Sequence, residues 1–189
     1  MRRLLRRACT GLLLAASCCG ALAAAEAPGV WLDVPFVKQE KNGCGAASIA
    51  MVMQYWQQHR NTTSEANADT QYANIEHTLL SGGANGISAS EMKDYFLHHG
   101  YAAFAFAGDL NLLEHHLHEG RPLIVALQPG FHLPLHYVVV AGVDEQDHLV
   151  LLNDPAQRKL LKQDESAFEK EWKATGNWTL LAVPGANPH

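Results

Sequence analysis

The sequence has very little cysteine outside its first 25 residues. Cys9, Cys18 and Cys19 fall in that segment, so Cys44 is the only thiol in the rest of the chain. One thiol cannot form a disulfide within the chain, and a single cysteine is too few for a structural zinc site built on thiolates. Cys44 therefore calls for a chemical explanation.

Other absences narrow the class of protein. The formal net charge is −5 and no basic stripe occurs outside the first 25 residues, so nucleic acid is not an expected partner. No internal repeat or low-complexity stretch divides the chain, and no apolar run has the length of a membrane span. Residues 26–189 are enough for one domain with its own core. We expect a single domain there, and nothing in the sequence indicates its oligomeric state.

Residues 1–25 have the pattern of a secretory signal peptide. An arginine-rich start precedes a short apolar core, and small residues around Ala23 offer cleavage points for a signal peptidase. The run Leu14-Ala-Ala-Ser-Cys18 leaves a lipoprotein anchor at Cys18 as an alternative, although Ala15 stands where such anchors usually have a bulky aliphatic residue. We predict a periplasmic or secreted protein, with cleavage to a soluble form favoured over lipid anchoring.

The spacing of apolar residues changes along the chain from helical to strand-like. One helical pattern begins at Cys44, and four further ones cover about 71–80, 88–100, 109–120 and 164–172. Short β-branched or leucine-rich runs cover 122–128, 136–143, 148–153 and 178–183. The sequence therefore predicts an α+β fold, with an N-terminal helical half that carries Cys44 packed on a C-terminal antiparallel sheet.

Cys44 lies where a thiol becomes a nucleophile. Only the thiolate is reactive, and the pKa of a thiol falls at a helix N-terminus or beside an imidazolium. Cys44 opens a helical pattern, which supplies the first condition. His136 is the best-placed histidine for the second, because it begins a strongly apolar strand and so lies at the end of the sheet.

Two further residues complete a candidate catalytic group. Asp154 ends the partner strand of the hairpin, so its carboxylate can orient the second nitrogen of His136. Asn153 is a rival for this role, but adjacent strand residues point to opposite faces and only one of the two can serve. Gln39 stands five residues before Cys44, where its side-chain amide can join the Cys44 backbone N–H as an oxyanion hole.

The order and spacing of these segments resemble the papain-like bacteriocin-processing peptidases, which cut leader peptides after a double glycine. The likeness runs from about residue 34 to 183 and rests on Gln39-x-x-x-x-Cys44-Gly45, His136-Tyr-Val-Val-Val, Gly142-x-Asp144, Asn153-Asp154-Pro155 and Phe168-Glu-Lys-Glu-Trp172. The resemblance implies a papain-like fold with Cys44 as nucleophile, His136 as base, Asp154 as orienting acid and Gln39 as oxyanion donor. It implies a peptide or protein substrate and no cofactor.

The chain departs from the family pattern at two places. In the bacteriocin exporters this domain is cytoplasmic and fused to a transporter and an ATPase, whereas here it follows a predicted signal peptide. The usual Asp-Cys-Gly is Gly43-Cys44-Gly45 in this sequence. We predict a cysteine peptidase that acts on exported peptides, with glycine-containing cleavage sites as an option.

Alternatives remain open at the level of function and of single residues. The same cleft would serve a catalytically silent peptide-binding module, or an acyltransferase similar to phytochelatin synthase. His132 is a substitute base, although Pro134 favours a loop for it at the rim of the cleft. His115 and His118 share a helix face, but an exposed polar face explains them as well as a metal site does, and we predict no metal. Gly82-Gly83 is interpreted as a loop.

Overall fold

The computed structural model describes residues 29–60, 67–80, 85–130 and 133–185. The predicted signal peptide, the cysteine considered for lipid anchoring, the Gly82-Gly83 pair and His132 lie outside these residues. No helix in the described part of the chain is long and apolar enough to cross a membrane.

Helices and strands are mixed in the described residues. The helices are α1 (Cys44–His59), α2 (Ala68–Leu80), α3 (Ala89–His98), α4 (Leu110–His118) and α5 (Glu165–Lys173). The strands are β1 (Val30–Trp31), β2 (Tyr101–Ala107), β3 (Leu123–Leu127), β4 (His136–Asp144), β5 (Leu149–Asn153), β6 (Leu161–Asp164) and β7 (Trp178–Pro184). The predicted α+β class is confirmed.

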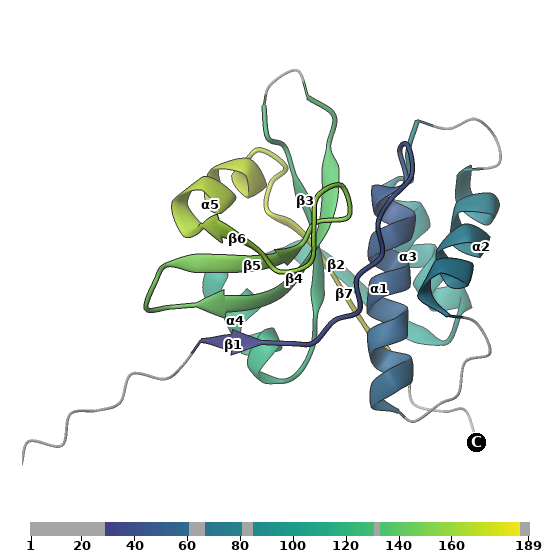
Figure 1. Cartoon of the computed structure of the whole chain (residues 1–189), viewed down its shortest axis with the longest axis horizontal. Helices are drawn as coiled ribbons and strands as arrows, with labels where there is room; N and C mark the ends of the chain where they lie inside the picture. The colour runs from purple at the N-terminus through teal and green to yellow at the C-terminus, as the bar shows by residue number, and fades with distance from the viewer. Residues whose placement is uncertain (1–28, 61–66, 81–84, 131–132, 186–189) are drawn as a thin grey trace, which may run out of the picture.

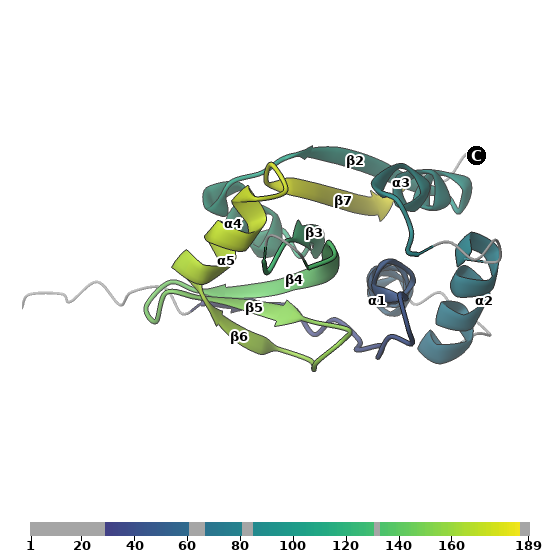
Figure 2. The same ribbon diagram turned by 90° about the horizontal axis from the view of Figure 1, so that it is seen from above.

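The described strands form one antiparallel sheet. Its order is β2-β7-β3-β4-β5-β6, with β1 added beside β4. Helices α1, α2 and α3 lie on one side of the molecule, and α4 and α5 cover the other face of the sheet (Figures 1 and 2). Helix α1, which begins with Cys44, thus packs on the sheet as the sequence predicts.

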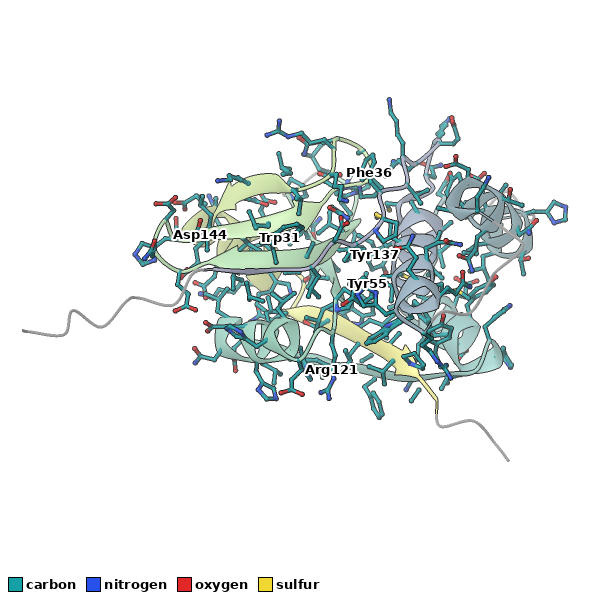
Figure 3. All side chains as sticks on the ribbon, turned by 60° about the horizontal axis from the view of Figure 1, so that its bottom comes forward. Trp31, Phe36, Tyr55, Arg121, Tyr137 and Asp144 are labelled. Atoms are coloured by element: carbon teal, nitrogen blue, oxygen red, sulfur yellow. The ribbon has the colours of Figure 1, made fainter. Side chains whose placement is uncertain are left out.

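Helix α1 is buried on almost all sides. The sequence predicts one apolar face, but every residue from Gly45 to Tyr55 is buried because α1 lies between α2 and the sheet (Figure 2). Small side chains at Ala46, Ala47 and Ala50 allow this close approach. Tyr55 of α1 and Tyr137 of β4 belong to the same core (Figure 3). This packing holds the N-terminus of α1 fixed against the sheet.

Side-chain caps set the starts of three helices. Ser88 and Glu91 form the predicted capping box at α3, and Asp109 caps α4 by accepting the Leu112 N–H at 2.8 Å. The Asp164 side chain accepts hydrogen bonds from the backbone N–H groups of Ser166 and Ala167 at the start of α5. These starts are as the sequence predicts.

The sequence prediction missed three strands: β2, β6 and the two-residue strand β1 beside β4. Strand β2 lies between α3 and α4 and pairs with β7 along its whole length, so the N-terminal half is not purely helical. Its sequence, Tyr-Ala-Ala-Phe-Ala-Phe-Ala, mixes strand-favouring aromatic residues with alanines and has no β-branched residue, so its pairing with β7 decides its structure. Strand β6 is a short edge strand of four residues beside β5.

Candidate active site

Cys44 is the first residue of α1 and opens on a cavity of about 830 Å³. Its thiol is half-buried and accepts backbone hydrogen bonds from Gly45 and from Tyr137 of β4. The preceding residue, Gly43, has no side chain to cap the helix, so N–H groups of the first turn point toward the reactive end. The nucleophile candidate therefore sits at the junction of the helical half and the sheet.

His136 and Asp154 come together through the pairing of β4 and β5. Val139 pairs with Asn153, so the start of β4 lies beside the end of β5. His136 Nε2 lies 2.7 Å from Asp154 Oδ1, and the ring also hydrogen-bonds the Cys44 thiol. Because Nε2 faces the carboxylate, Nδ1 is the ring nitrogen left to face the sulfur.

Asn153 is excluded as the orienting group by its own contacts. It is fully buried, its Nδ2 donates to the Val34 carbonyl at 3.0 Å, and its Oδ1 accepts the Leu160 N–H at 3.0 Å. Both ends of the amide are thus engaged away from the imidazole. Adjacent strand residues point to opposite faces, as the sequence argument assumed, and it is Asp154 rather than Asn153 that faces His136.

The electrostatics of the three residues favour a thiolate–imidazolium pair. Burial raises the pKa of the Cys44 thiol, but hydrogen bonds from His136 and the Tyr137 backbone outweigh it and hold that pKa below its usual value. Burial lowers the pKa of His136, while Asp154 and Cys44 raise it to about 9. The pKa of Asp154 is lowered, because its hydrogen bonds outweigh the effect of burial.

Gln39 lines the same cavity as Cys44 and His136. Its backbone N–H donates to the Pro155 carbonyl at 3.0 Å, which ties the segment before α1 to the loop that carries Asp154. Its Oε1 is buried without a hydrogen-bond partner among the described residues. The structure thus brings together all four residues singled out in the sequence.

Residues 31–180 match the model of the family described as Peptidase_C39 like. The chain belongs to this family. This match confirms the family that the sequence predicted from its resemblance to double-glycine peptidases. A comparison with curated protein sequences gives no match.

Solved C39 peptidase domains share the fold. A Bacillus anthracis protein described as a C39-like peptidase is 19% identical and superposes with a TM-score of 0.60 over 84% of this chain and 99% of its own. A double-glycine-motif protease from an AMS/PCAT transporter, solved with the leader peptide, is 21% identical with a TM-score of 0.59 over 84% and 99%. The peptidase domain of Streptococcus ComA, a bi-functional ABC transporter, is 21% identical with a TM-score of 0.57 over 80% and 98%. The fold is therefore the papain-like fold of C39 peptidases.

The glycine that replaces the family's usual aspartate has a structural reason in this C39-like chain. A Cβ atom at Gly43 would lie 2.3 Å from Tyr72 Oη of α2. The Tyr72 hydroxyl accepts the Glu40 N–H at 2.8 Å and donates to Glu76 at 2.9 Å. Tyr72 therefore occupies the space beside Gly43 and fixes the turn before Cys44. The helical pattern over 71–80 gave no indication of this contact.

Gln157 is a second residue that the sequence argument missed. Its Nε2 donates to Asp154 Oδ2 at 2.7 Å, while the Ala156 N–H donates to Oδ1 at 2.9 Å. The Gln157 N–H also donates to the Asp154 carbonyl at 2.9 Å, which closes a tight turn. Both carboxylate oxygens are thus held in place. The Asn-Asp-Pro turn was visible in the sequence, but the direction of a side chain three residues later was not.

Proposed function

We propose that this chain is an active cysteine peptidase that hydrolyses peptide bonds through a thioester on Cys44. One observation carries the proposal: the His136 ring hydrogen-bonds the Cys44 thiol on one side and Asp154 on the other, within a cavity open to substrate. Family membership supports the reaction class, and the geometry supports an intact catalytic group.

In the first step the Cys44 thiolate attacks the carbonyl carbon of the scissile peptide bond. The oxyanion that forms accepts hydrogen bonds from the Cys44 backbone N–H and the Gln39 amide, and one such donor contributes about 10²–10³ in rate. His136 gives its proton to the departing amine as the C–N bond breaks. Asp154 holds the ring in position and stabilises its charged form.

In the second step His136 takes a proton from water, and the water oxygen attacks the thioester. The C–S bond breaks, the carboxylic acid product leaves and the thiolate is regenerated. Acyl transfer would follow the same path with an amine in place of water. No observation favours transfer, so hydrolysis is the function proposed.

We propose peptides with glycine-containing cleavage sites as substrates. The resemblance to double-glycine peptidases supports this choice, as does the leader peptide present in one related structure. The arginine-rich and apolar start of the chain supports action in the periplasm or outside the cell.

The proposal is tested by incubating the purified protein with a peptide panel that differs only in glycine pairs, and by locating new termini with mass spectrometry. We expect cleavage by the wild-type protein and none by Cys44→Ala, which keeps the cavity but lacks the sulfur. Equal binding of a peptide by both proteins with no cleavage by either would contradict the proposal and indicate a peptide-binding module instead.

A further inference from the structure

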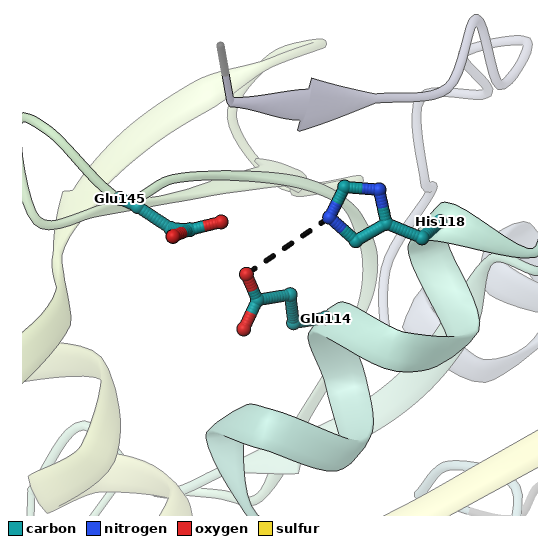
Figure 4. A group of neighbouring side chains, drawn as sticks. All are labelled: Glu114, His118 and Glu145. Carbon is teal, nitrogen blue, oxygen red and sulfur yellow. Dashed lines mark ion pairs between the residues drawn. The ribbon is translucent and has the colours of Figure 1, made fainter. Parts of the chain in front are cut away.

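Three potential metal ligands gather at the end of the molecule where β4 turns into β5. Glu114 and His118 are four residues apart on α4, and Glu145 follows β4 in the hairpin (Figure 4). One ligand atom from each lies within 4.8 Å of the others, and His118 Nε2 is 4.0 Å from Glu114 Oε1. This is the one such group of three among the described residues.

The residue types and distances suit a small divalent cation. Zinc takes imidazole nitrogen and carboxylate oxygen at about 2.0–2.2 Å, which places neighbouring ligands about 3.3–3.6 Å apart. The three side chains would need to approach by only about an ångström. His118 is 50% exposed and Glu114 30% exposed, so both have room to move and the site can be filled from solution.

Two of the three potential ligands are carboxylates that come from different elements of the fold. Glu114 lies on α4 and Glu145 in the hairpin after β4, yet their carboxylate oxygens lie within 4.8 Å of each other. Two like charges at this distance repel unless a proton or a cation lies between them.

We infer that Glu114, His118 and Glu145 bind a divalent transition-metal ion of the zinc class, which links α4 to the β4–β5 hairpin. The sequence interpretation considered His115 with His118 and predicted no metal. The structure instead pairs His118 with one carboxylate on its own helix and one from a hairpin, and the hairpin contact is invisible in the sequence.

This metal site is separate from the candidate active site. His136 begins β4 and Glu145 follows its end, and nine residues of strand separate the two ends by roughly 25–30 Å. An ion here would stabilise the packing of α4 on the sheet and would take no part in peptide hydrolysis. Loss of the bound ion and loss of peptidase activity are therefore independent outcomes.

The test is calorimetric titration with zinc chloride of the full chain in which all four cysteines (Cys9, Cys18, Cys19 and Cys44) are replaced by serine, because free thiols can bind zinc themselves. We expect one zinc site that is weakened about tenfold or more by His118→Ala and by Glu145→Gln, and that is unchanged by His115→Ala. His115→Ala removes a neighbouring imidazole outside the group and so controls for nonspecific histidine binding.

Thermal unfolding gives a second readout. Zinc should raise the Tm of the background protein and of His115→Ala, but not that of His118→Ala. Because Glu145 is exposed in the hairpin, Glu145→Gln should fold normally. It therefore replaces His118→Ala as the test variant if His118→Ala fails to fold. Zinc binding of equal strength in all variants, or no binding at millimolar zinc, would overturn the inference.

Discussion

At the scale of single residues, the sequence predicted that Cys44, His136, Asp154 and Gln39 lie together, but it did not predict the contacts that hold them in place. A unique thiol at a helix start, a histidine at a strand start and a glutamine five residues upstream are patterns along the chain. Tyr72 and Gln157 act through contacts between distant or turning segments, such as the Tyr72 hydroxyl on the Glu40 N–H. Such contacts depend on the fold and leave no periodic signal.

Gln157 gives the prediction at this scale. Gln157→Ala removes the hydrogen bond to Asp154 Oδ2, so the carboxylate loses one of its anchors and holds His136 less firmly. A hydrogen bond to a charged group contributes about 1.5–3 kcal/mol, and we expect kcat/KM to fall about tenfold or more with KM little changed. Steady-state kinetics on a cleaved peptide measures both.

The control for that experiment is Gln163→Ala. Gln163 lines the same cavity from β6 but is not among the described hydrogen-bond partners of Asp154. Its substitution should leave kcat unchanged. An equal loss in both variants would show that the cavity wall, rather than the anchoring of Asp154, carries the effect.

At the scale of elements, hydrophobic period and caps predicted most helices and the central strands. The sequence pattern did not predict strand β2, because its four alanines favour helices in isolation. Its pairing with β7 makes it a strand. The burial of α1 was underestimated because its alanines carry little weight in a pattern of large apolar residues. Tertiary packing decided both cases.

The contact between the start of α1 and α2 gives the prediction at this scale. Gly43→Ala places a Cβ atom 2.3 Å from Tyr72 Oη, so the turn before Cys44 must shift. We expect a loss of about 1–3 kcal/mol in the free energy of unfolding, measured with urea, and lower activity. Adding Tyr72→Phe removes the clashing oxygen and should recover part of the loss in Gly43→Ala.

That double variant also provides the decisive comparison. Tyr72→Phe alone removes the hydrogen bond to the Glu40 N–H and should itself destabilise the protein. If the two substitutions act through one contact, their combined cost is smaller than the sum of the single costs. Strictly additive costs would contradict the packing argument for Gly43.

At the scale of the whole molecule, a helical half and a sheet half meet at the candidate active site. Cys44 comes from the first, and His136 and Asp154 come from the second. The sequence predicted this division, because helical and strand-like patterns separate along the chain. The surfaces that line the cavity could not be predicted, since they come from loops and strand ends such as Pro129 and Ala156.

Acid stability tests the whole-molecule account through Asp154. Its pKa is lower in the folded protein than the ordinary value of 3.8, so its stabilising contribution is fully present above pH 3.8. That contribution is lost as the pH falls through the folded pKa. We expect the difference in free energy of unfolding between wild type and Asp154→Asn to be constant around pH 5, below the range in which His136 titrates, and to shrink below pH 3.8.

The matched control is Asp147→Asn, which changes an exposed aspartate in the β4–β5 hairpin. Its stability should follow that of the wild type throughout the acid range. A gap between wild type and Asp154→Asn that stays the same down to pH 2 would contradict the assignment of Asp154 as an ionised partner of His136.

The pH dependence of Cys44 alkylation tests the central claim most directly. Iodoacetamide reacts with the thiolate, and mass spectrometry restricts the readout to the peptide that carries Cys44. In the wild-type protein we expect the alkylation rate to reach half its maximum at a pH below the free-thiol pKa of about 8.5, and in His136→Ala we expect that pH to return toward the free-thiol value. A midpoint near the free-thiol value that is the same in both proteins would contradict the claim.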